Sequence, residues 1–226
     1  MVGLATPLFG SVHTIVTGDF AEAQLPGWHA VIFPPYFVAG AIYSGFAMVL
    51  TLAIPLRAVY RLQEYVTTRH LDNMAKVMLA SGLVVAYGYC MEFFAAWYGD
   101  QSGEEFTIWN RAFGPYAPVY WTLLTCNIAI PQVLWSKAVR TNVYILFAIA
   151  LVINVGMWLE RFIIVVTSLH RDFLPSSWNM YYPTFWDWST FAGTIGLFSA
   201  MLFLFIRLLP MISLYEMREL IHREES

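Results

Sequence analysis

Three ionisable side chains lie inside long apolar stretches of the sequence. Glu92 is in the second stretch, and Glu160 and Arg161 are neighbours in the fourth. An ionisable group at membrane depth destabilises its helix unless it is paired or hydrated, so each is a candidate for function. Adjacent helical residues point about 100° apart, so we expect Glu160 and Arg161 to be poor partners and Glu92 to pair with Arg161.

Such a pair has two possible roles. It either fixes helix register as a structural ion pair or forms a protonatable step in a proton path. The polar side chains that could extend a proton path are Tyr87, Tyr89, Asn127 and Asn154.

A second group of titratable side chains lies outside the apolar stretches. His13, Asp19 and His29 precede the first stretch, and His170 and Asp172 follow the fourth. Histidine beside a carboxylate can accept and relay protons near neutral pH, which is what the oxidation of a quinol's two hydroxyl groups would need. The alternative is that these histidines are hydrogen-bonded anchors at the membrane surface.

Several kinds of site are missing from the sequence. None of the five histidines lies in the middle of an apolar stretch, so we expect no haem held between helices. There is no phosphate-binding glycine loop, no zinc spacing of His and Cys, and no catalytic triad signature. We therefore expect this chain to bind no metal, and any redox metal to belong to a partner.

The elements that must position these residues are transmembrane helices. Of 226 residues, 59% are apolar and 12% are charged, against about 25% charged in soluble domains. About 20 apolar residues are needed for one helical span. The sequence predicts an all-α integral membrane protein, a bundle of about five transmembrane helices. The predicted spans are 33–56, 76–97, 116–136, 143–168 and 189–209.

Basic residues are distributed unevenly over the connections. Most of them fall between spans one and two, between spans three and four, and in the tail, whereas the other connections are acidic. The positive-inside rule therefore predicts a multi-pass protein with its N-terminus outside and its C-terminus cytoplasmic. In a bacterium it would lie in the inner (cytoplasmic) membrane, with its acidic face toward the periplasm. We expect residues 1–32 to be an outward-facing leader too polar to span, 33–209 to be the bundle, and 210–226 to be a cytoplasmic tail.

Aromatic residues crowd the outward ends of the predicted spans, above all in the loop 169–188. One interpretation is the aromatic belt that anchors membrane proteins at the interface. The other is an ordered surface that caps the bundle or docks a partner, because the loop is long for a simple connection.

Several motifs resemble one membrane protein family. The longest is PGWHAVIFPPYFVAGAIYSG at 26–45; others are SVHTIV at 11–16, GDFA at 18–21, NVGMWLERF at 154–162, VTSL at 166–169 and DFLP at 172–175. The chain resembles the NrfD-like, polysulphide reductase type membrane subunits, and among them the ActC subunit of bacterial alternative complex III. Members usually contain two consecutive helix bundles, and this chain is similar to the second.

The resemblance implies a quinol-interacting membrane subunit of a quinol:acceptor oxidoreductase. It implies a bound quinone or quinol (menaquinone or ubiquinone), and no haem or iron–sulphur cluster on this chain. The implied partners are a peripheral iron–sulphur subunit, a homologous membrane subunit, cytochrome c-type subunits and lipid, with no nucleic acid. Asp19 and His29, with His13, become the quinol-side candidates; Glu92, Glu160, Arg161 and Asp172 become candidates for proton movement.

Two other functions are compatible with such a bundle. A non-catalytic scaffold would anchor electron-transfer subunits without binding quinone. A stand-alone secondary transporter would require broken helices and inverted repeats, against which the few polar groups inside the spans argue.

Overall fold

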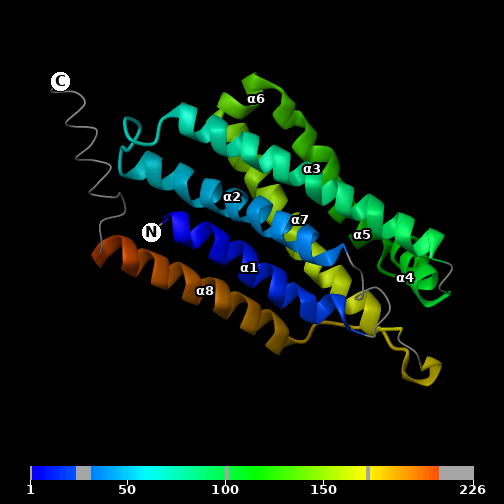
Figure 1. Ribbon diagram of the computed structural model, residues 1–226. Helices are drawn as coiled ribbons and strands as arrows, with labels where there is room; N and C mark the ends of the chain where they lie inside the picture. The colour runs from blue at the N-terminus through cyan, green and yellow to red at the C-terminus, as the bar shows by residue number, and fades with distance from the viewer. Residues whose placement is uncertain (1, 24–31, 100–101, 172–173, 209–226) are drawn as a thin grey trace. The chain divides into compact units, whose positions relative to one another are not determined.

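The computed structural model describes residues 2–23, 32–99, 102–171 and 174–208, and they are helical with no strand among them. The chain divides into two compact units, Met1–Asn179 and Met180–Ser226, which we describe separately. The elements shown in Figure 1 are α1 (Val2–Ala21), α2 (Phe33–Val59), α3 (Thr68–Tyr98), α4 (Ser102–Phe113), α5 (Ala117–Leu124), the π-helical turn η1 (Thr125–Ala129), the 3-10 segment η2 (Ile130–Trp135), α6 (Lys137–Thr141), α7 (Val143–Leu169), the 3-10 turn η3 (Pro175–Ser177) and α8 (Phe185–Leu208).

Four of these helices, α2, α3, α7 and α8, are long and apolar enough to cross a membrane. They confirm the prediction of an all-α integral membrane protein. The helix α3 begins eight residues before the predicted second span because Thr67 and His70 form a reciprocal cap, in which the Thr67 N–H donates to His70 Nδ1 at 3.2 Å. In the second unit, Thr184 and Asp187 form a similar cap, which starts α8 at Phe185 rather than 189.

The first unit is organised around α2, which contacts α1, α3 and α7 (Figure 1). Two glycines of α3 allow close packing. A methyl group at Gly88 would lie 2.2 Å from the Tyr36 ring, and one at Gly82 would lie 2.8 Å from the Tyr43 ring. Both tyrosines are buried, so two phenol hydroxyls lie inside the bundle.

The third predicted span, 116–136, is not a continuous α-helix, which corrects the sequence prediction. It is divided into α5, η1 and η2. Pro131 explains the break, because proline has no N–H to donate to the carbonyl of Asn127 four residues earlier. The Tyr43 hydroxyl of α2 donates to that carbonyl instead, at 3.4 Å. The break therefore brings a polar stretch of backbone into the bundle.

The helix α1 occupies most of the segment 1–32 that we expect to be an outward-facing leader. It has 20 residues, which make it about 30 Å long. It lies antiparallel along α2, so its first residues approach the end of α2 that carries Val59 (Figure 1). Three of its side-chain hydroxyls donate to carbonyls of the same helix. The donors are Ser11, Thr14 and Thr17.

The short helix α4 has no counterpart among the predicted spans, and its buried face includes polar residues. Its polar residues Thr107, Asn110 and Arg111 are buried against the bundle, whereas Trp109 and Phe113 are exposed. This spacing of three and four residues places the polar side chains on one helical face. The helix thus delivers a buried arginine to the neighbouring helices.

Candidate functional site

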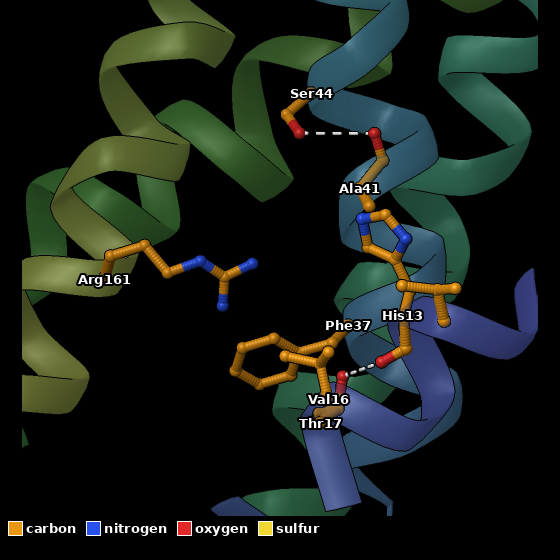
Figure 2. A pocket seen from close by; sticks show the side chains of 8 residues that line it. His13, Val16, Thr17, Phe37, Ala41, Ser44 and Arg161 are labelled. Carbon is orange, nitrogen blue, oxygen red and sulfur yellow. Dashed lines mark hydrogen bonds between the residues drawn. The ribbon is translucent and has the colours of Figure 1, made fainter. Parts of the chain in front are cut away.

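A cavity of about 280 Å³ lies between α1, α2 and α7. Two basic side chains border it: His13 on α1, and Arg161, which extends from α7 on the opposite side (Figure 2). The rest of the lining is mainly apolar. It consists of Val12, Val16 and Thr17 from α1 and Phe37, Ala41 and Ser44 from α2.

The His13 ring is oriented by its own helix. Its Nδ1 lies 3.0 Å from the carbonyl oxygen of Phe9, one turn earlier, and the Phe9 ring packs beside it with 4.0 Å between centroids. Because a carbonyl can only accept, Nδ1 carries the hydrogen, and in the neutral ring Nε2 is left as an acceptor. The side chain can therefore accept a proton from a ligand in the cavity.

Arg161 is held between an aromatic ring and a carboxylate. Its guanidinium lies 4.0 Å from the centroid of the Phe37 ring, and its Nη1 lies 3.0 Å from Oε1 of Glu160. This contact corrects the prediction that adjacent Glu160 and Arg161 would not pair. The arginine side chain is long enough to fold back along the helix surface, although the two Cα–Cβ bonds diverge.

Glu160 is the end of a buried hydrogen-bond chain. The Tyr89 hydroxyl donates to Glu160 Oε2 at 2.5 Å, and Asn127 Nδ2 donates to the Tyr89 hydroxyl at 2.9 Å. Asn127 fits against α7 only because residue 156 is glycine, since a methyl group there would lie 2.2 Å from Asn127 Oδ1. Of the other polar residues considered, Asn154 donates to Thr51 at 3.0 Å, and Tyr87 is exposed.

Glu92 pairs with Arg111 and not with Arg161, which corrects the predicted pairing. Arg111 Nη1 donates to Glu92 Oε1 at 2.5 Å, and Arg111 Nε donates to the Thr167 hydroxyl at 3.2 Å. The arginine side chain is only 2% exposed. Arg111 therefore ties α4 to α3 and α7. The sequence signal for it was the spacing of Thr107, Asn110 and Arg111 on one face of 102–113.

The remaining predicted site residues do not meet at the cavity. Asp19 is exposed near the end of α1 and does not line it. His29 and Asp172 lie outside the described residues. His170 is buried beside Tyr116, with 5.0 Å between ring centroids.

The His170 ring is fixed at the end of α7. Burial lowers the pKa of its imidazole, and hydrogen bonds with the carbonyls of Thr167 and Val166 oppose that shift. The ring is therefore neutral at pH 7, with its hydrogen on Nδ1. The loop that follows α7 folds back nearby, where Arg171 lies 5.5 Å from the Trp178 ring centroid.

Residues 3–171 match the sequence model of one protein family, described as polysulphide reductase, NrfD. The chain belongs to the NrfD family. Proteins of the NrfD family are membrane subunits of quinol or polysulphide oxidoreductase complexes, and they work with iron–sulphur subunits. No match is found among curated protein sequences.

The NrfD match covers the whole cavity. It begins within α1 and ends just after α7, so all eight lining residues belong to the family region. The family match thus includes most of α1. The helix α8 lies beyond the match.

Proposed function

We propose that this NrfD chain is the quinol-interacting membrane subunit of a quinol:acceptor oxidoreductase similar to alternative complex III, and that its cavity binds the quinol head group. The observation that carries the proposal is that His13 and Arg161 lie on opposite sides of a mainly apolar cavity. A quinol ring is apolar on its faces and carries two hydroxyl groups at opposite edges. Such a lining suits both features.

The cavity volume supports a head group rather than a whole quinol. Pockets that bury drug-sized ligands have volumes of about 300 to 1000 Å³, and this cavity has about 280 Å³. A substituted ring would fill it, and the long isoprenoid tail of menaquinol or ubiquinol would remain in the lipid. The exposed apolar residues on α1 around the cavity are compatible with that tail. They are Leu8, Val12, Ile15 and Val16.

The chemistry assigned to the chain is proton transfer and positioning. Oxidation of a quinol releases two protons and two electrons. His13 accepts a proton from one hydroxyl through Nε2, and Arg161 hydrogen-bonds the other oxygen and stabilises negative charge on it. Glu160, in contact with Arg161, is placed to take the second proton. The electrons pass to iron–sulphur clusters of a peripheral subunit in the same complex.

The other predicted residues take different places in the proposal. Glu92 is assigned a structural ion pair with Arg111 and no proton step, because it contacts that arginine and does not line the cavity. Asp19 lies at the outer end of α1, where it faces solvent or a partner subunit. The proposed partners are the iron–sulphur subunit, a homologous membrane subunit and cytochrome c-type subunits in a bacterial inner membrane.

The antiparallel packing of α1 along α2 changes the proposed topology. If α2 enters the membrane from the outside, α1 crosses in the opposite sense and its first residue is cytoplasmic. With the broken third span counted, six crossings then leave both ends of the bundle cytoplasmic, in agreement with the basic tail. In this proposed topology, the cavity beside the first turns of α2 would lie in the outer half of the bilayer.

This topology predicts the accessibility of the two ends of α1. A peptide tag fused ahead of Met1 should resist external protease in intact cells and be cleaved after permeabilisation. In a Cys90→Ala, Cys126→Ala background, Glu22→Cys should react with an impermeant maleimide in intact cells. Cleavage of the tag in intact cells would contradict a membrane-crossing α1 and restore the outward-facing leader.

The quinol site is tested by filling the cavity. We expect Ala41→Phe to remove most of the quinone that copurifies with the complex and most of its quinol:acceptor activity, because the ring occupies the proposed head-group position. Val49→Phe is the matched control, since Val49 is exposed on the same helix and does not line the cavity. Normal quinone content and activity in assembled Ala41→Phe complex would favour the scaffold function instead.

A further inference from the structure

A chain of polar contacts runs from the broken third span to the cavity. Asn127 Nδ2 donates to the Tyr89 hydroxyl at 2.9 Å, and that hydroxyl donates to Glu160 Oε2 at 2.5 Å. The other carboxylate oxygen, Oε1, lies 3.0 Å from Nη1 of Arg161, which lines the cavity. Side chains from η1, α3 and α7 are thus joined in one series of contacts that ends at the proposed quinol site.

The Asn127 amide fixes the direction of the hydrogen bonds in this chain. Its Nδ2 has two hydrogens, and it donates to the Tyr89 hydroxyl and to the sulphur atom of Met157, the latter at 3.5 Å. The Tyr89 oxygen therefore accepts from Asn127, and its single hydrogen points to Glu160. If the amide turned over, its oxygen would accept that hydrogen and draw it away from Glu160.

The carboxyl group of Glu160 is held from three helices. A buried carboxylate needs hydrogen bonds and a counter-ion, because an isolated charge is costly to remove from water. Glu160 has Arg161 as its counter-ion on α7 and Tyr89 as its donor on α3. The Tyr36 hydroxyl of α2 interacts with both Tyr89 and Glu160. The carboxyl group therefore cannot rotate without losing at least one of these contacts.

Arg161 needs such support more than Glu160 does. Its side chain is 41% exposed, whereas that of Glu160 is 2% exposed. A long cationic side chain loses much rotamer freedom when it is ordered, and a ligand-binding side chain is placed well only if its neighbours are themselves fixed. We propose that Asn127 and Tyr89 are positioning residues which, through Glu160, hold the Arg161 guanidinium over the Phe37 ring, where it meets the quinol oxygen.

The same chain is poorly suited to conduct protons. A proton that passed from Glu160 to Tyr89 could continue along the chain only if Asn127 accepted it, and the asparagine amide does not titrate near neutral pH. In the proposed function, Glu160 Oε1 on the Arg161 side is then the oxygen that takes the second proton. The chain orients Glu160 and does not carry its proton toward the third span.

Tyr89→Phe tests the positioning role, because it removes the hydroxyl and keeps the ring. A displaced Arg161 stabilises the charge on the reacting quinol less well, so kcat should fall by about 10- to 100-fold while KM and copurifying quinone stay within about twofold. Tyr43→Phe is the matched control, since it removes a phenol hydroxyl that donates to the Asn127 carbonyl and not to the chain. A normal kcat in assembled Tyr89→Phe complex, with or without a lower melting temperature, would overturn the proposal.

Maps of the complex by electron cryomicroscopy provide the second readout. We expect the Arg161 guanidinium over the Phe37 ring in the wild type and in Tyr43→Phe, as in Figure 2, and away from the ring in Tyr89→Phe. An Arg161 side chain that keeps its place in Tyr89→Phe while kcat falls would overturn the positioning role and favour proton transfer through Tyr89.

Glu160→Gln tests the same chain from its other end. Because the Tyr89 hydroxyl needs an acceptor, the amide oxygen takes the place of Oε2, and the amide nitrogen faces Arg161. Two donors then meet, so Arg161 should leave the Phe37 ring in this variant also. A guanidinium that stays over the ring would show that Glu160 does not hold it, whatever the state of Tyr89→Phe.

The functional meaning of this chain rests on the proposed quinol site, but the two can fail separately. Quinone content in Ala41→Phe reports on the cavity, and neither Tyr89 nor Asn127 lines it. Normal quinone in Ala41→Phe with a displaced Arg161 in Tyr89→Phe would uphold the positioning chain and reject the quinol site. Loss of quinone in Ala41→Phe with Arg161 in place in Tyr89→Phe would do the reverse.

Discussion

Replacement of His13 by glutamine should leave quinol bound but lower quinol:acceptor turnover by about 10²- to 10⁴-fold, the range over which a positioned proton acceptor contributes. Glutamine is close in size to histidine and keeps a polar group facing the cavity, but it cannot take a proton near neutral pH. We would measure steady-state turnover and copurifying quinone in His13→Gln complex, after checking that the subunits remain assembled.

Asp19→Asn is the matched comparison for His13→Gln. Both residues lie on α1, but only His13 lines the cavity. Because Asp19 does not accept a proton from the bound quinol in this proposal, we expect the turnover of Asp19→Asn to stay within about twofold of the wild type. The reverse result, with Asp19→Asn inactive and His13→Gln active, would move the proton acceptor out of the cavity to the outer surface.

Replacement of Arg111 by methionine should produce the largest loss of stability. Arg111 is buried and hydrogen-bonds Glu92 and Thr167, so the change leaves a carboxylate without its partner inside the bundle. Breaking one side of a buried ion pair typically destabilises a protein by about 3 to 5 kcal/mol. We expect Arg111→Met to lower the yield of assembled complex and its melting temperature.

The double variant Arg111→Met, Glu92→Gln separates the unpaired charge from the other contacts of Arg111. Because it also removes the carboxylate charge, it should recover a substantial part of the lost stability, and the non-additivity measures the coupling of the pair. Equal losses in the single and double variants would show that the ion pair does not hold α4 in place. Quinone content should follow assembly and not the charge of Glu92.

The spans of this protein could be predicted from its sequence, but the partners of its buried charged residues could not. Most of the spans could be predicted because a run of about 20 apolar residues suffices to identify a transmembrane helix. The partners of Glu92, Glu160 and Arg161 could not be predicted, because pairing depends on which helices adjoin. Arg111 lies between two predicted spans in the sequence, and the packing of α4 makes it the partner of Glu92.

The segment before α2 shows the same limit. Residues 1–32 contain glycine, proline and polar side chains, so hydropathy predicted a leader, whereas the structure forms α1 over most of it. Its hydroxyls are satisfied by its own carbonyls, and its His13 faces a cavity. Hydropathy sums side chains one by one and takes no account of these contacts.

The sequence by itself determined the membrane class, the all-α fold, most of the spans and, through long motifs, the resemblance to the NrfD family. These properties depend on local composition and residue order, which do not change with the packing of the helices. Only the tertiary structure decided that His13 and Arg161 border one cavity, that Pro131 breaks the third span beside Tyr43, and that Glu160 ends a buried polar chain. These depend on contacts between residues far apart in the sequence, for which helical periodicity holds no information.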